Sequence, residues 1–137
     1  MRGRHAAAIN QYSQIDVHTA VQNASPHRLI EMLLDGALGR LVTADGNMQR
    51  GEIAAKGENI GFAISIIEGL RGSLNQQAGG DIAGNLDQLY QYMTRRLVEA
   101  NLRDDRGMLR EVHGLLTQVR GGWAGIRDTP AAQAGAY

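Results

Sequence analysis

The most constraining feature of this sequence is the spacing of its apolar residues, which recur every three or four positions through most of the chain. The clearest run has intervals of 3, 4, 3, 4 and 3 residues: Leu109, Val112, Leu116, Val119, Trp123 and Ile126. These intervals match the turn of an α-helix and place the residues on one face. The same period predicts four amphipathic helices at roughly 26–47, 52–74, 81–102 and 105–127. No stretch shows the strict alternation of a strand, so the fold class is expected to be all-α.

Short breaks between the predicted helices determine how they can pack. Gly51 lies in the first break, residues 75–80 form the second, and residues 103–105 form the third. Helices joined by such short links lie beside one another in opposite directions, which predicts an antiparallel four-helix bundle. The pair Ser25 and Pro26 favours a helix start, because serine caps free N–H groups and proline tolerates the first helical position.

These boundaries divide the chain into three predicted parts. Residues 1–24 are polar and weakly periodic, and we expect an extended or short helical segment packed on the bundle. Residues 25–128 form the helical bundle itself. Residues 129–137 are expected to be a flexible tail, because Pro130 ends the last periodic run.

Charge and composition exclude several classes of function. The chain of 137 residues has 14 lysines and arginines against 14 aspartates and glutamates, which gives a net charge of zero. This balance argues against nucleic acid or an anionic membrane as a partner. The absence of cysteine excludes disulfides and thiolate chemistry. The chain also lacks the long apolar stretches of a signal peptide or a membrane-spanning helix, so we expect a cytoplasmic protein without membrane insertion.

Candidate catalytic and metal-binding residues are weak. A di-iron bundle needs Glu-x-x-His on facing helices, whereas Glu111 and His113 are only two positions apart and no second copy exists. Glu31 and Asp35 share a helix face, but a solvated face explains them better than acid–base catalysis. The double glycine at 79–80 is interpreted as a turn, since no phosphate-binding motif surrounds it. We therefore expect no metal, no cofactor and no enzymatic activity.

Glycine and surplus apolar residues point to a helical partner. Each glycine inside a helix weakens it by about 0.5–1 kcal/mol relative to alanine, yet about ten of the 18 glycines fall inside the predicted helices. Gly57 and Gly61 would let another backbone approach, either a helix of the same bundle or a helix of another protein. The second helix also carries isoleucines on more than one side. Such excess indicates a groove for a partner helix or, as the alternative, a self-associating structural or adaptor bundle.

Several strings of this sequence, taken together, resemble the FliS family of flagellar secretion chaperones. They keep the family's order and spacing from about Tyr12 to Trp123. The strings are 24–37 (ASPHRLIEMLLDGA), 56–58 (KGE), 64–70 (ISIIEGL), 79–86 (GGDIAGNL), 89–93 (LYQYM), 95–97 (RRL) and 100–102 (ANL).

The resemblance implies a function that composition and periodicity do not. Members of the family are cytoplasmic helical bundles without catalytic activity. They bind the disordered C-terminal segment of flagellin, prevent premature polymerisation and deliver flagellin to the flagellar type III export apparatus. The export gate and other flagellar regulators are further partners to consider, and the free protein is expected to be a monomer or a weak homodimer.

The resemblance also implies which residues form the site. The N-terminal segment of the family covers the partner groove until flagellin displaces it, and the matching residues here are Tyr12, Ile15 and Val17. The groove would be formed by the second, third and fourth predicted helices. Its candidate residues are Ile53, Gly57, Ile60, Ile64, Ile67, Leu86, Tyr90, Met93, Leu97 and Trp123.

Overall fold

The computed structural model describes residues 24–125, apart from the side chains of residues 76–78. These residues form four α-helices, namely α2 (Pro26–Gln49), α3 (Ile53–Gly72), α4 (Gln76–Arg103) and α5 (Arg106–Gly125). The prediction of four helices and an all-α fold is therefore confirmed over this part of the chain. The predicted N-terminal segment and the predicted tail at 129–137 lie outside the described residues.

The helix ends follow local chemistry in the sequence. Ser25 caps α2, because its Oγ accepts a hydrogen bond from the backbone N–H of Arg28 at 3.2 Å. Gly80 has φ 55° and ψ −129°, a conformation open to glycine, and it interrupts α4. The sequence predicted a helix starting at 81, and the structure adds a short helical turn in front of Gly80. That turn forms because glycine can join two helical pieces across a kink.

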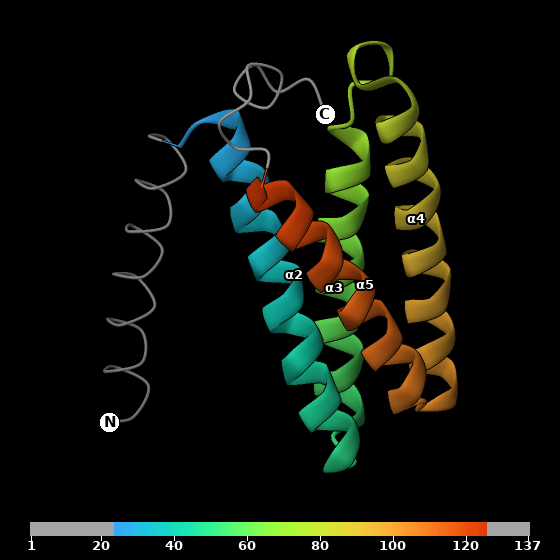
Figure 1. The fold of residues 1–137 in the computed structure, drawn as a ribbon. Helices are drawn as coiled ribbons and strands as arrows, with labels where there is room; N and C mark the ends of the chain where they lie inside the picture. The colour runs from blue at the N-terminus through green and yellow to red at the C-terminus, as the bar shows by residue number, and fades with distance from the viewer. Residues whose placement is uncertain (1–23, 126–137) are drawn as a thin grey trace.

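Neighbouring helices in sequence pack side by side, and α5 closes the bundle against α2. Figure 1 shows α5 running diagonally from the lower end of α4 to the upper end of α2. Ion pairs fix the antiparallel register of α2 and α5, with Asp45 bonded to Arg106 and Asp35 bonded to Arg120. Residues 24 and 125 consequently lie at the same end of the bundle.

The core is assembled from one apolar stripe of each helix. Its largest side chains are less than 2% exposed: Leu34, Leu41, Ile60, Ile67, Leu70, Met93, Leu97, Leu109, Leu116 and Val112. Burial of each such side chain contributes about 1.5–3 kcal/mol relative to exposure, which outweighs the cost of the helical glycines.

A second group of large apolar residues faces the solvent. It consists of Leu33, Val42, Ile53, Phe62, Ile82, Val98 and Leu102. Within residues 24–125, no helix is both long enough and apolar enough to cross a membrane.

Candidate partner-binding surface

The predicted groove residues occupy three different environments. Ile53 is 71% exposed, Gly57 is half-buried, and Ile64 and Leu86 are partly buried against the core. The remaining candidates are buried core residues: Ile60, Ile67, Tyr90, Met93, Leu97 and Trp123. A ligand that binds the described conformation can touch only the exposed and partly buried candidates, because the buried side chains present almost no surface. Their assignment as flagellin contacts stays a prediction, as does that of Tyr12, Ile15 and Val17, which lie outside the described residues.

Polar contacts hold α3 and α4 together along one outer edge of the bundle. Lys56 Nζ donates to the carbonyl oxygen of Asn101 at 2.9 Å and also contacts the carboxylate of Asp104. Farther along, Thr94 Oγ1 donates to Glu68 Oε1 at 2.9 Å. These pairs show that the start of α3 faces the end of α4.

In this register, exposed apolar residues gather beside the two glycines. Val98 and Leu102 are one helical turn apart on α4 and are 47% and 79% exposed. A Cβ added at Gly61 would meet nothing within 4 Å, and one at Gly57 would meet only Asn101 Oδ1 at 4.0 Å. We call this surface the α3–α4 seam and define it by Ile53, Gly57, Gly61, Val98, Asn101 and Leu102. Because Gly57 and Gly61 have no side chains, the seam leaves room there for the backbone of another chain.

A pocket continues the seam at the end of the bundle where α3 starts. It has a volume of about 220 Å³, and Ile53 stands at its edge. The lining residues come from the last turn of α2, the α2–α3 connection, the first turn of α3 and the α4–α5 connection: Asn47, Met48, Gly51, Glu52, Ile53, Lys56 and Asp104. A side chain bound on the seam could therefore extend into this pocket.

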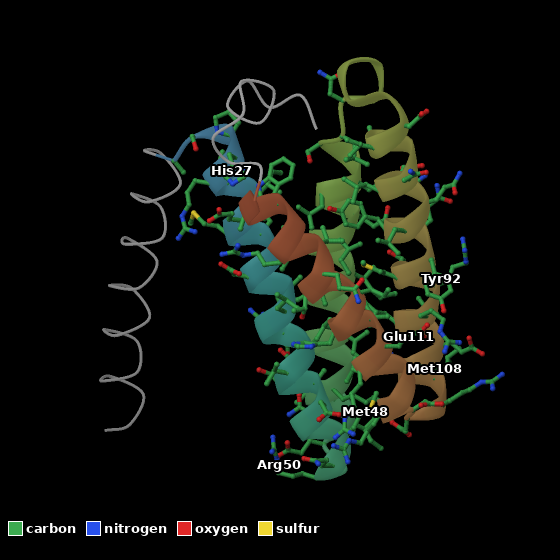
Figure 2. The ribbon with its side chains drawn as sticks, viewed as in Figure 1. His27, Met48, Arg50, Tyr92, Met108 and Glu111 are labelled. Atoms are coloured by element: carbon green, nitrogen blue, oxygen red, sulfur yellow. The ribbon has the colours of Figure 1, made fainter. Side chains whose placement is uncertain are left out.

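Trp123 lies away from the seam, at the opposite end of the bundle. Its indole Nε1 donates to the carbonyl oxygen of His27 at 2.9 Å, and its ring stacks on the imidazole with centroids 4.9 Å apart. Figure 2 shows His27 where α2 begins. Trp123 thus joins the last turns of α5 to the first turn of α2, and the structure does not bring it together with the seam.

The two carboxylates considered for acid–base work are engaged by arginines. Burial acts to raise the pKa of Glu31, but hydrogen bonds from Arg28 and His27 and the charge of Arg120 together lower it below its ordinary value. Asp35 Oδ1 accepts a hydrogen bond from Arg120 Nε at 2.8 Å. Both groups therefore pair α2 with α5 and offer no poised acid or base.

A similar ion-pair cluster links α4 to α5 on the outside. Figure 2 shows Tyr92 and Glu111 close to one another on facing helices. A hydrogen bond from the Tyr92 hydroxyl and another from Arg96 lower the pKa of Glu111. Among the described residues, no three histidine, aspartate or glutamate side chains converge as a metal-ligand set.

Sequence reasoning did not nominate Val98 and Leu102, although both are among the most exposed apolar residues of α4. The nominated groove residues came from the resemblance to the family, and most of them lie on the apolar stripes that form the core. Val98 and Leu102 lie on a different face of α4 from its buried residues Met93, Leu97 and Ala100. Large apolar residues off the stripe are the sequence signal that would have found them.

Comparison with known proteins finds one family over most of the chain. The sequence model described as flagellar protein FliS matches residues 8–130. The flagellar secretion chaperone FliSB of Pseudomonas aeruginosa is 51% identical over 119 residues, which cover 87% of this chain and 94% of that protein. The flagellar secretion chaperone FliS of Salmonella typhimurium is 49% identical over 129 residues, which cover 93% and 96%. A Bacillus subtilis protein of the same name is 36% identical over 104 residues, which cover 76% and 77%.

Proposed function

Because this chain belongs to the FliS family, we propose that it is a cytoplasmic flagellar export chaperone that binds the disordered C-terminal segment of flagellin. Bound in this way, flagellin would stay monomeric until it reaches the flagellar type III export apparatus. The names of the relatives, flagellar secretion chaperones, support the export role. In this role the chain acts by binding, without catalysis.

The observation that carries the proposal is the α3–α4 seam. Its exposed Ile53, Val98 and Leu102 form an apolar surface, and the uncovered backbone at Gly61 lets a helix approach it. A partner that folds as it binds spends roughly 2–5 kcal/mol on ordering. Apolar side chains arranged along two helices can offset that cost when they pack against the apolar face of an amphipathic helix.

Calorimetry with a flagellin C-terminal peptide tests both the function and its location. We expect Leu102→Asp to weaken binding by about tenfold, since the new carboxylate must be desolvated against the partner's apolar face. Ile82→Asp is the matched control, because Ile82 is also an exposed residue of α4, at 53%, but lies near the other end of that helix. Circular dichroism should show unchanged helix content for both variants.

The outcomes separate two kinds of failure. If the unmodified protein binds no flagellin peptide, the proposed function is wrong. If it binds but Leu102→Asp and Ile53→Asp have the affinity of the control, the seam is not the site, and the buried candidates in the core become the alternative.

Self-association is the competing function, and the same exposed apolar residues favour it. A self-associating bundle would dimerise through these residues in the absence of flagellin. Sedimentation over a wide range of concentrations would then show a dimer that Leu102→Asp dissociates. The chaperone proposal instead expects a mainly monomeric protein whose assembly state changes when the flagellin peptide is added.

A further inference from the structure

Helix α2 contains two aspartates that are followed directly by glycine, Asp35–Gly36 and Asp45–Gly46. Aspartate followed by glycine is especially prone to form isoaspartate, because glycine has no Cβ to shield its amide nitrogen from the preceding carboxyl group. The partner-binding surface uses neither bond. The structure places the two bonds in different surroundings, and those surroundings decide which of them can react.

Isoaspartate forms in two steps that need only water. The glycine nitrogen attacks Cγ of the aspartic acid, a C–N bond forms, the Cγ–OH bond breaks, and the amide proton leaves with the hydroxyl as water. Water then adds to one carbonyl carbon of the cyclic imide and breaks its bond to nitrogen, which returns aspartate or gives isoaspartate. No atom is oxidised or reduced. The neutral acid reacts faster than the carboxylate, because a hydroxyl group leaves more readily than an oxide.

The helical backbone protects both bonds until the helix opens locally. In an α-helix the glycine N–H donates to the carbonyl oxygen four residues earlier, so its nitrogen is not free to attack. Local opening costs least where a helix ends. Asp45 is one helical turn from the end of α2 at Gln49, whereas Asp35 lies in the middle of the helix. The Asp45–Gly46 bond is therefore the more easily opened of the two.

Helix α5 holds the Asp45 carboxylate away from this reaction. Arg106, the first residue of α5, donates two hydrogen bonds to Asp45, of 2.8 and 3.1 Å. The Nε of Arg110 lies 3.8 Å from Oδ1 of the same carboxylate. The hydrogen bonds from Arg106 and the positive charges of both arginines outweigh partial burial and lower the pKa of Asp45. The carboxylate thus stays ionised, which is the slow form, as long as the first turn of α5 stays docked.

A pocket beside Asp45 supplies space and water for the reaction. It lies between α2 and α5 and has a volume of about 180 Å³. Its lining residues are Leu41, Val42, Asp45, Leu109, Arg110 and His113. Once released from Arg106, the carboxyl group can turn in this space towards its own main chain, and water from the pocket can open the imide.

We propose that Asp45–Gly46 is a modification site, at which isoaspartate forms when the first turn of α5 leaves the end of α2. The main chain of the product runs through the former side chain and is longer by a methylene group. The carboxylate is then out of register with Arg106, so the ion pair that docks the start of α5 is lost. The free α-carboxylate of an isoaspartate is the group that S-adenosylmethionine-dependent isoaspartyl methyltransferases esterify. The modified bond is therefore a substrate for that class of repair enzyme.

Peptide mapping of the full-length protein after prolonged incubation tests the site. We expect isoaspartate at position 45 to accumulate faster at about pH 5 than at about pH 8, since the neutral acid is the reactive form. Arg106→Gln should speed this accumulation about two- to fivefold, because it removes the ion pair that closes the site. Arg71→Gln is the matched control and should leave position 45 unchanged. Arg71 pairs with Asp87 across α3 and α4 at 2.6 Å, and its side chain is 38% exposed against 33% for Arg106.

Two results would overturn the proposal directly. One is equal accumulation at Asp45 in the Arg106→Gln variant, the control and the unmodified protein. The other is a parallel rise at Asp35, which would report general loosening of the bundle. Gly46→Ala in the Arg106→Gln background checks the assignment, since the added Cβ shields the nitrogen and would meet only the guanidinium of Arg50, 3.1 Å away. Methyl groups transferred by an isoaspartyl methyltransferase should disappear from position 45 in this double variant, and methylation that persists there would contradict the chemistry.

The effect of the modification on α5 is measured separately, by amide hydrogen exchange. Protein enriched in isoaspartate at position 45 should exchange its amides faster over residues 106–110 than fresh protein does. Treatment with the methyltransferase, which restores aspartate, should reverse the difference. Equal exchange before and after modification would mean that α5 stays docked, and would overturn the loss of the ion pair. None of these measurements uses flagellin, so their outcome is independent of the proposed function.

Discussion

Two isoleucines of α3 show how position along one helical stripe decides a residue's role. Ile60 and Ile53 are seven residues apart and fall on nearly the same face. Ile60 is 1% exposed because α2 and α4 flank it, whereas Ile53 is 71% exposed because it is the first residue of α3 and lies at the end of the bundle. Equal side chains at equivalent heptad positions thus serve the core and the surface.

This difference predicts opposite effects of the same substitution. We expect Ile60→Asp to lower the free energy of unfolding by about 4 kcal/mol or more, since a carboxylate would be buried without a partner. Ile53→Asp should change it by less than about 0.5 kcal/mol, as for other exposed positions. Urea denaturation followed by circular dichroism measures both. Comparable losses for the two variants would show that Ile53 is packed.

The stripe in the sequence predicted the core well and the surface poorly. Leu109, Val112 and Leu116 are buried as their spacing indicated, because period alone tells which face a helix turns inward. Exposure of Ile53, in contrast, depends on where α3 ends relative to its neighbours. The stripe also contained Trp123, but not its contact with His27, which is 96 residues away in sequence. Neither relation is present in the local pattern.

At the scale of elements, the α4–α5 connection depends on one buried cation. Lys56 of α3 is 4% exposed, donates to the carbonyl of Asn101 and pairs with Asp104, whose φ is 51°. A positive φ is uncommon for a residue other than glycine. The ammonium therefore caps the end of α4 and holds the turn in a conformation that the backbone alone disfavours.

Replacement of Lys56 should destabilise the α4–α5 connection more than the rest of the bundle. We expect Lys56→Met to reduce stability by about 1–3 kcal/mol, because the Asn101 carbonyl loses its side-chain donor while the apolar volume is kept. Amide hydrogen exchange should quicken first around residues 101–106. Exchange that stays unchanged there, or a loss spread evenly over all helices, would refute this role.

Helix order and direction were predictable from the sequence, since short links leave antiparallel packing as the simple solution. The double glycine also marked the break before residue 81, and Gly80 does interrupt α4. The diagonal course of α5 was not predictable, because it arises from contacts with α2 such as Asp45 with Arg106. That course creates the pocket between α2 and α5, which no sequence pattern had suggested.

At the scale of the whole molecule, carboxylates of α2 form ion pairs that hold α5 against α2. A hydrogen bond from Arg106 lowers the pKa of Asp45, and Arg28, His27 and Arg120 outweigh burial to lower that of Glu31. A carboxyl group whose folded pKa is lowered stabilises the fold above its unfolded pKa. That stabilisation is lost as pH falls through the folded value.

The bundle should therefore weaken in acid through the contact of α2 with α5. We expect the free energy of unfolding to fall as pH drops from about 5 to about 2. Asp45→Asn should lower the free energy of unfolding by about 0.5–1 kcal/mol at pH 7. It should also reduce the difference in that free energy between pH 7 and about pH 2. Urea midpoints across this range, with Asp81→Asn as an exposed control, measure the effect. If Asp45→Asn has the same pH dependence of stability as the unmodified protein, Asp45 is not a source of the acid sensitivity.

The stacking of Trp123 on His27 has a consequence for competition at the bundle. It places residues 24 and 125, the two ends of the described part of the chain, at one end of the bundle. A short flexible tether gives its segment an effective concentration of about millimolar. Any free partner that shares a surface with a tethered segment must overcome this local excess.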